Sequence, residues 1–266
     1  SCDVFYYDLA LKVGIKKIEE TALKFGLGMR HKVGVSVEAK GLIPSKEWKK
    51  RVRDGDWFIG DTANAGIGQG DVLASPLQLA VMSARIATGK NITPKLIKSS
   101  EKTLKNEPVI TELDVKLASL DAIRKALYQV VNDRNGTAYK SRIIQKNYRM
   151  AGKTGTSQVF TISEAERIQG IIPNENRKWH RRDHALFVCY APIENPKVAV
   201  SVVVEHGGGG SKVAAPIARD IVLQTLYGND PPSEAYPVKD REKIKLRQKE
   251  LQKLRPKLSN IRKTRT

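Results

Sequence analysis

Residues 150–156 read Met150-Ala151-Gly152-Lys153-Thr154-Gly155-Thr156, and this run decides the fold and the chemistry that the sequence predicts. Its apolar start and its continuation beyond Thr156 are typical of a β-strand. Lys153 supplies a fixed cation, and the two threonines offer hydroxyl and N–H donors. Gly155 has no Cβ, so a substrate backbone can lie against the strand. The run therefore predicts the substrate-facing edge strand of an acyl-transfer site.

The same residues partly match a phosphate-binding loop, because Gly152-Lys153-Thr154 fits the end of Gly-x-x-x-x-Gly-Lys-Ser/Thr. The first glycine of that pattern is missing, since position 147 is Asn147. A phosphate loop also opens a helix whose N–H groups point at the anion, whereas this run continues as a strand. We therefore exclude that site. The run Gly66-Ile67-Gly68-Gln69-Gly70 follows no strand and predicts a tight turn before a helix.

Two further β-type runs, 184–191 and 198–205, extend the predicted sheet. The apolar density of 198–204 is that of a strand covered on both faces. The loop 192–197 between the two runs has hairpin length, so we expect them to be antiparallel neighbours.

Helical periodicity surrounds these strands. The strongest end signals are Ser75 as N-cap, Pro76 at the first helical position, Gln78 completing a capping box and Gly89 at the end. Helices are expected within residues 5–13, 15–23, 75–89, 121–135 and 214–228. The sequence thus predicts an α+β fold, with an antiparallel sheet packed between helices.

Two details of this helical pattern are weaker. Asp121 is the candidate N-cap of the helix that ends near residue 135. Residues 28–60 predict an irregular, basic surface excursion with a short turn capped by Ser45. No internal repeat is visible.

Charge is concentrated at the end of the chain. The whole sequence has a net charge of +19 over 266 residues, and residues 238–266 hold twelve Lys or Arg against three Asp or Glu, or +9. Residues 1–230 are therefore predicted to be the folded domain, and 231–266 a basic, flexible, partly helical tail. A solvated terminus and a tether to anionic lipid or a partner both fit the tail. Without interleaved aromatic residues or zinc-finger spacing, nucleic acid is not a predicted partner.

Other features of the composition further limit the classes of protein to which this chain can belong. At 40% apolar residues the chain can bury a real core, yet no run approaches the eighteen apolar residues of a membrane span. The chain opens at Ser1 without a Met or a leader, which predicts an internal start. Cys2 and Cys189 are too far apart in sequence and too few to predict a disulfide framework.

Several motifs accompany the lysine strand and together carry a resemblance to a known family. Ser1-Cys2-Asp3 opens an apolar helix, as the second motif does in the serine penicillin-binding proteins, whose three motifs are Ser-x-x-Lys, Ser-Asp-Asn and Lys-Thr-Gly. The third motif is Lys153-Thr154-Gly155-Thr156. The resemblance spans residues 1 to about 228 and is closest to class B members of the elongation type, penicillin-binding protein 2. Its other motifs are Pro44-Ser45-Lys46-Glu47-Trp48-Lys49, Gly60-Asp61-Thr62-Ala63-Asn64, Gly66-Ile67-Gly68-Gln69-Gly70 and Ser75-Pro76-Leu77-Gln78.

This resemblance implies the serine β-lactamase/D,D-peptidase-like fold, truncated here at its N-terminal side, so that the chain is the C-terminal part of a transpeptidase domain. The implied enzyme is a serine-type D-Ala-D-Ala transpeptidase or carboxypeptidase that cross-links peptidoglycan stem peptides during cell elongation through an acyl-enzyme. By the same resemblance, Ser1, Asp3 and Lys153 are catalytic. Thr154, Gly155 and Thr156 bind the substrate, with the Thr156 N–H in the oxyanion hole.

The chain departs from the family pattern in two places. The second motif ends in Asp3, and because an ionised carboxylate cannot donate a hydrogen bond to a carbonyl, we expect Asp3 to position Lys153 or a neighbour instead. Ser99-Ser100-Glu101-Lys102 has the spacing of the nucleophile motif, but it lies between the other two motifs in a polar stretch. We interpret it as a coincidence. The nucleophile is then expected upstream of Ser1, and this chain alone is predicted to be inactive.

Partners follow from the resemblance as well. The family implies β-lactams and stem peptides as ligands, a membrane glycosyltransferase as partner, and a place on the periplasmic face of the inner membrane through an anchor outside this chain. No cofactor is needed for the chemistry. Some elongation-type relatives hold a structural zinc, so Cys2 is either a zinc ligand or a small buried hydrophobe. His180 and His184 are expected to be ordinary loop and strand residues.

Two other function classes stay open. A β-lactam-binding sensor or β-lactamase-like protein shares the motifs, although the long helical insert around residues 66–70 argues against a compact lactamase. A non-catalytic polyanion-binding scaffold explains the charge but not the motifs.

Overall fold

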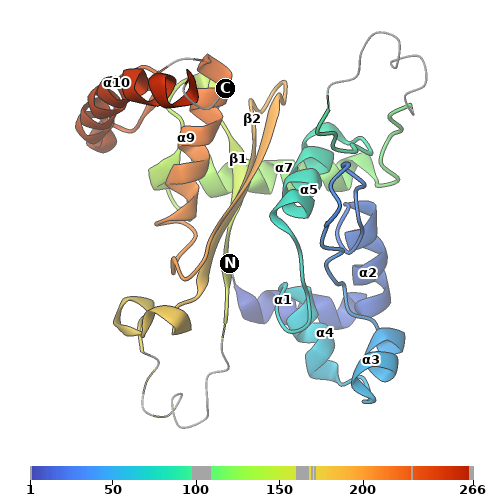
Figure 1. The fold of residues 1–266 in the computed structure, drawn as a ribbon. Coiled ribbons are helices and arrows are strands. Elements are labelled where there is room, and N and C mark those ends of the chain that lie inside the picture. The colour runs from blue at the N-terminus through green and yellow to red at the C-terminus, as the bar shows by residue number, and fades with distance from the viewer. Residues whose placement is uncertain are drawn as a thin grey trace.

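The protein consists of a three-stranded sheet with helices on both sides and a long C-terminal helix (Figure 1). The computed structural model describes residues 2–97, 109–159, 168, 170, 172–228 and 230–263, without the side chains of 255–263. Its strands are β1 (Ala151–Ser157), β2 (His184–Ala191) and β3 (Val198–Val204). Its α-helices are α1 (Asp3–Val13), α2 (Ile15–Lys24), α3 (Lys46–Arg53), α4 (Ile59–Gly66), α5 (Pro76–Thr88), α7 (Leu117–Asn132), α9 (Ala214–Tyr227) and α10 (Arg241–Lys263).

The sheet has the order β1-β2-β3, and both pairs are antiparallel. Lys153 lies opposite Val188, and Cys189 lies opposite Val200. The three predicted strands and the antiparallel pairing of the second and third are confirmed, and with the helices they confirm the α+β expectation. Gly152 is required at its position, because a Cβ there would lie 2.4 Å from the Val188 carbonyl oxygen.

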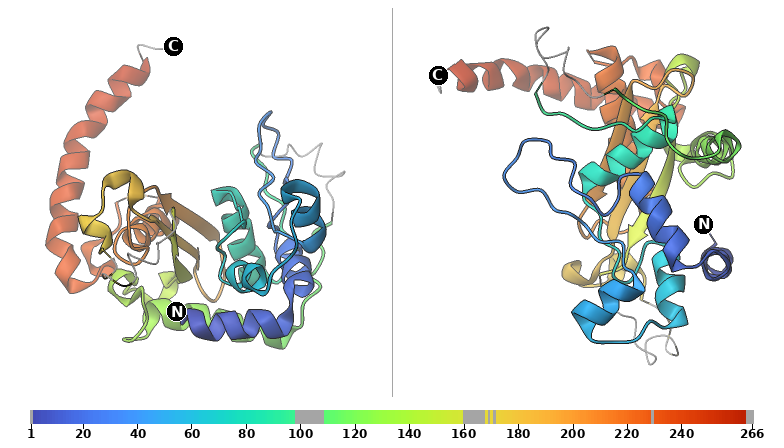
Figure 2. Two further views of the ribbon diagram at one scale, coloured as in Figure 1. Left: turned by 90° about the horizontal axis from the view of Figure 1, so that it is seen from below. Right: turned by 90° about the vertical axis from the view of Figure 1, so that its right-hand side faces the viewer.

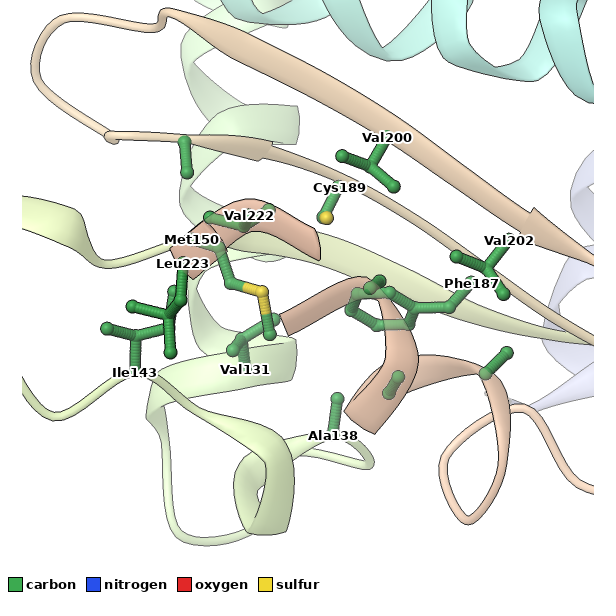
Figure 3. Close-up of a cluster of buried hydrophobic side chains, with 14 of the residues drawn as sticks. Val131, Ala138, Ile143, Met150, Phe187, Cys189, Val200, Val202, Val222 and Leu223 are labelled. Carbon is green, nitrogen blue, oxygen red and sulfur yellow. The ribbon is translucent and has the colours of Figure 1, made fainter. Parts of the chain in front are cut away.

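The main core lies between the sheet, α7 and α9 (Figure 3). Its fully buried side chains include Met150, which directly precedes β1, Phe187 and Cys189 of β2, and Val131 of α7. Helix α9 contributes the small residues Ala214, Ala215 and Ala218, which let it pack directly on β2 and β3. The contacts with α7 thus fix the position of β1 on the core side of the sheet.

The helices α1 to α5 form a second region beside the sheet (Figures 1 and 2). Phe25 of this region packs with Leu113 and with Leu120 of α7 in a small buried cluster. Helix α1 crosses α4 very closely, since a Cβ on Gly66 would lie 2.2 Å from the Ala10 Cβ. Helix α5 connects the two regions because it also contacts β2 and β3.

Residues at the helix ends determine where several of these helices begin and end. Ser75 caps α5, Gln78 completes the capping box, and Gly89 ends the helix in the left-handed conformation, as predicted. The Gln78 side chain is fully buried and its Nε2 donates to the carbonyls of Met29 and Lys40, at 2.6 and 2.7 Å. The Ser75-Pro76-Leu77-Gln78 motif therefore ties a long loop to α5.

Two sequence predictions of helices differ from the structure. Helix α7 begins at Leu117 after Lys116, one turn before the predicted cap Asp121, whose carboxylate instead accepts from Arg124 at 3.0 Å. The predicted irregular segment 28–60 holds α3, capped by Ser45, and the start of α4, which was not predicted.

The C-terminal segment folds back onto the molecule as α10, which stands out at the side of α9 (Figure 2). Ile244 is buried in the main core cluster, and Arg219 joins α9 to Asp240 at 2.7 Å. Leu246, Leu251 and Leu254 are exposed. The expected helical character is present. The boundary at residue 230 and the flexibility of the tail stay predictions.

Candidate active site

The candidate site lies along β1, an edge strand of the sheet that the described residues form. Strand β1 is buried at Ala151 and Gly152 and becomes exposed at Thr156. Its start is held from α7, because Asn132 Nδ2 donates to the Met150 carbonyl at 3.0 Å. The lysine and the two threonines thus lie on the part of the strand that leaves the core.

Lys153 is the cation of the predicted motif, and its side chain is half-buried. Burial lowers its pKa from the usual 10.5, and the negative charge of Asp3 partly opposes that shift. Its Nζ donates to the Thr154 carbonyl at 2.7 Å. A half-buried amine with a lowered pKa loses its proton more readily near neutral pH, which is what a proton-transferring lysine needs.

Asp3 reaches the site from the first turn of α1, which begins directly after Cys2. Its charge acts on Lys153 although the two residues lie 150 positions apart in the sequence. Cys2 and Asp3 are both exposed. Ser1, the third expected catalytic residue, lies outside the described residues. The fold therefore brings the charge of Asp3 within electrostatic range of Lys153.

Thr154 and Gly155 are positioned by neighbouring loops. The Thr154 hydroxyl lies 3.0 Å from the Thr137 hydroxyl, which follows α7. A Cβ on Gly210 would lie 2.4 Å from the Gly155 carbonyl oxygen, so the glycine run after β3 packs directly on the strand. Sequence reasoning did not identify Thr137, since a single threonine in a loop carries no pattern.

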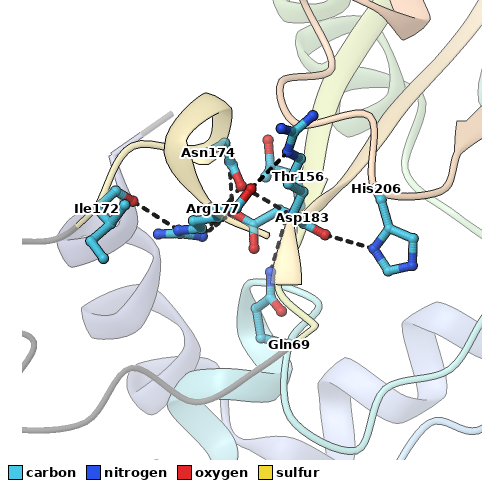
Figure 4. Close-up of polar contacts among 8 residues, drawn as sticks. Gln69, Thr156, Ile172, Asn174, Arg177, Asp183 and His206 are labelled. Carbon is cyan, nitrogen blue, oxygen red and sulfur yellow. Dashed lines mark hydrogen bonds and ion pairs between the residues drawn. The ribbon is translucent and has the colours of Figure 1, made fainter. Parts of the chain in front are cut away.

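At the far end of the strand, Thr156 contacts a residue that sequence reasoning assigned only to a turn. Gln69 Nε2 donates to the Thr156 carbonyl at 3.0 Å (Figure 4). Next to this contact a buried carboxylate, Asp183, accepts from Asn174 at 2.9 Å and from Arg177 at 3.2 Å (Figure 4). These residues close the end of β1 where β2 begins.

The remaining sequence candidates lie outside this site or outside the described residues. Ser99-Ser100-Glu101-Lys102 lies outside the described residues. His184 Nδ1 accepts from the His206 N–H at 2.9 Å, and its ring lies 4.8 Å from that of His206. Within the described part of the chain, no three His, Cys, Asp or Glu side chains gather as metal ligands. The ranges described also hold no helix that is long and apolar enough to cross a membrane.

Comparisons with known proteins place this geometry in context. The family model described as "Penicillin binding protein transpeptidase domain" matches residues 1–223. The peptidoglycan D,D-transpeptidase MrdA of Haemophilus influenzae is 37% identical over 254 residues, which is 93% of this chain and 38% of that protein. MrdA of Escherichia coli K12 is 32% identical over 241 residues, 86% of this chain and 36% of that protein. The chain thus spans just over a third of the length of these relatives.

Solved structures agree with the sequence relatives. Penicillin-binding protein 2 of Helicobacter pylori, in its complex with MreC, has a TM-score of 0.70 at 32% identity, over 85% of this chain and 38% of that one. Penicillin-binding protein 2 of Pseudomonas aeruginosa, in complex with WCK 5153, has a TM-score of 0.69 at 35% identity, over 86% of this chain and 47% of that one. The serine D,D-peptidase-like fold expected from the motifs is confirmed.

Proposed function

Because this chain belongs to the penicillin-binding protein transpeptidase family, in its elongation-type branch, we propose that it is the C-terminal part of a peptidoglycan D,D-transpeptidase. The activity, substrates and partners of the whole protein are part of this proposal, since the chain spans only 38% of the relative from H. influenzae.

The observation that carries the proposal is the meeting of Asp3 and Lys153. A helix at the start of the chain and a strand in its middle bring the charge of Asp3 to act on the half-buried amine of Lys153, whose pKa is lowered. This pairing of a perturbed titratable group with a charge partner at an open strand edge is typical of a catalytic site.

The proposed reaction starts from a serine supplied by a segment outside this chain. The serine Oγ attacks the carbonyl carbon between two D-alanines of a stem peptide, and the C–N bond breaks to leave an acyl-enzyme. The serine proton passes to the leaving D-alanine nitrogen through Lys153 and Ser1. An amine of a neighbouring stem peptide then displaces the serine. The negative charge of Asp3 stabilises the protonated form of Lys153, and Asp3 donates no hydrogen bond to the substrate.

The binding residues take roles that follow from the strand. The Thr156 N–H donates to the oxyanion that forms on the attacked carbonyl, and the hydroxyls of Thr154 and Thr156 bind the terminal carboxylate. The absence of a side chain at Gly155 leaves room for the substrate backbone. Loss of one oxyanion donor costs about 3–4 kcal/mol of transition-state stabilisation. Since only the backbone of Thr156 donates there, Thr156→Ala is expected to weaken binding more than chemistry.

Helix α1 supports the proposal that the serine lies on a segment that packs here. Val4 and Phe5 are 75% and 60% exposed, although this helix carries Asp3 of the site. An apolar helix face beside an incomplete site is expected to be covered by the protein that completes it. We assign that cover to the segment with the nucleophilic serine.

Labelling with a fluorescent penicillin tests the proposed function. The full-length protein that contains this chain should be labelled covalently, and Lys153→Ala should abolish labelling. Lys125→Ala changes an exposed lysine of α7 and should leave labelling as in wild type. The 266-residue chain alone should stay unlabelled, because its serine is elsewhere.

Three outcomes would overturn parts of this assignment. A labelled Ser99 in the isolated chain would make the internal motif the nucleophile. Labelling of the full-length protein with rapid hydrolysis and no cross-linking would favour the sensor or β-lactamase class. No labelling at all would favour a non-catalytic scaffold.

The chemistry of the family requires no cofactor, but zinc at Cys2 remains a separate proposal. The described residues do not make up a zinc site, since Cys2 is exposed and no ligand cluster forms around it. We assign Cys2 one thiolate ligand, with the other ligands outside this chain. Zinc bound by the full-length protein and lost in Cys2→Ser would support this assignment, and an unchanged zinc content would contradict it.

Place and partners complete the proposal. We assign the domain to the periplasmic face of the inner membrane, held by an anchor outside this chain, and expect a membrane glycosyltransferase as partner. The relative from H. pylori was solved in complex with MreC, which supports a place in a cell-wall assembly. Protease accessibility in spheroplasts and co-purification with the glycosyltransferase test these assignments.

A further inference from the structure

The run Gly66-Ile67-Gly68-Gln69-Gly70 is a turn that delivers one side chain to the candidate site. Gly68 and Gly70 have φ of +74° and +68°, a conformation that favours glycine. The backbone N–H of Gln69 donates to the Asn64 carbonyl at 2.9 Å, which holds the turn against the end of α4. Gln69 therefore lies between α4 and β1, on a turn that this hydrogen bond holds in place.

The contact of Gln69 shows how the Thr156 peptide is oriented. The Thr156 carbonyl accepts from Gln69 Nε2 at 3.0 Å and therefore points away from β2. In a strand, the N–H and the C=O of one residue face the same side, so the Thr156 N–H also faces the open edge. This is the edge where the proposed function puts the oxyanion and the substrate backbone.

A glutamine carboxamide can act at this edge like one peptide unit of a neighbouring strand. It has two N–H donors and one carbonyl acceptor. Its Nε2 is used by Thr156, while Oε1 has no recorded partner among the residues that the structure describes. The Thr156 carbonyl still has a second lone pair for a substrate N–H.

We propose that Gln69 is a substrate-positioning residue, whose Nε2 fixes the Thr156 carbonyl at the strand edge and whose Oε1 accepts a backbone N–H of the stem peptide. This inference rests on the proposed transpeptidase function and deepens it. It assigns to the glycine run a role in binding extended peptides, beyond that of a turn before α5.

Two variants of the full-length protein test the proposal, with benzylpenicillin as acylating probe. Gln69→Ala removes both groups and should weaken the pre-acylation complex, Ks, about two- to tenfold while the acylation step changes less than twofold. Gln69→Glu keeps the shape but sets a carboxylate oxygen against the Thr156 carbonyl, so Ks should weaken further than in Gln69→Ala. The same order should appear in KM for a peptide ending in D-Ala-D-Ala.

A matched control separates a loss of substrate positioning from a general loss of stability. Gln129→Ala makes the same chemical change at an exposed position of α7 and should keep wild-type Ks and Tm. Gln69→Glu acylated with wild-type constants would overturn the proposal, because shape alone would then suffice. An equal loss in Ks and acylation rate, together with a lower Tm, would also overturn it and assign Gln69 a merely structural role. The proposed function itself fails only if the wild-type protein is not acylated.

Discussion

The sheet region (residues 117–159 and 172–263) and the helical region (residues 2–97) bury their apolar side chains to different degrees. In the sheet region, Met150 and Phe187 are completely buried. In the helical region, Phe5 is 60% exposed and Ile59 is 75% exposed. The large buried cluster of the chain lies in the sheet region, whereas α1 of the helical region exposes several apolar side chains. The candidate site lies where the two regions meet, and the helical region contributes Asp3 and Gln69 to it.

The largest expected effect is in the sheet core. Phe187→Ala should lower the free energy of unfolding of this chain by about 3–5 kcal/mol, because it opens a cavity in a filled core. Phe5→Ala removes the same ring from the exposed face of α1 and should change it by less than about 0.5 kcal/mol. Denaturant unfolding measures both values. Similar losses in the two variants would show that α1 is packed like the core and would remove the contrast.

A second pair of variants tests whether α10 belongs to the sheet region. Ile244 is 7% exposed within the main cluster, so Ile244→Ala should cost about 2–3 kcal/mol. Leu254 lies later in the same helix and is 48% exposed, so Leu254→Ala should cost less than about 0.5 kcal/mol. Thermal and denaturant unfolding of the chain provide the comparison. A negligible effect of Ile244→Ala would instead support a domain that ends at residue 230 with an independent tail.

The smallest expected effect concerns Lys153, which lies where the two regions meet. Burial lowers the pKa of Lys153 below 10.5, so between the folded and unfolded pKa values the unfolded chain binds more protons and stability rises with pH. At pH 7 the buried charge is therefore unfavourable. We expect Lys153→Met to raise the free energy of unfolding there by about 0.5–1 kcal/mol.

The pH dependence gives this last prediction its control. The gain in Lys153→Met should shrink as the pH rises through the folded pKa of Lys153 toward 10.5, because the folded wild-type protein then loses the unfavourable charge. Lys125→Met, at an exposed position, should show no such trend. Destabilisation by Lys153→Met at pH 7 would mean that the contacts of Lys153 outweigh its desolvation.

Sequence reasoning succeeded where the signal is local. Ser75, Gln78 and Gly89 act within one helix, and a dense apolar run defines β3 without reference to the rest of the chain. It was wrong for the start of α7 because Asp121 has the chemistry of a cap but serves as a partner of Arg124. Helix α4 was not predicted, since its short sequence, with three glycines or alanines after Asp61, lacks apolar periodicity.

For the candidate site, the motifs indicated Lys153 and Asp3 but not their electrostatics. The lowered pKa of Lys153 results from burial, which depends on the packed fold. The hydrogen bond from Gln69 to Thr156 spans 87 positions, and single long-range hydrogen bonds leave no pattern in a sequence. Ser1 and the Ser99 motif lie outside the described residues, so their roles stay predictions.

The close contact at Gly66 couples the position of α1, which carries Asp3, to that of α4, which precedes the turn of Gln69. Because Gly66 meets the Ala10 Cβ almost without a gap, α1 and α4 have no room to slide toward each other. A rotation of α1 would therefore carry the turn of Gln69 with it and shift the far end of β1.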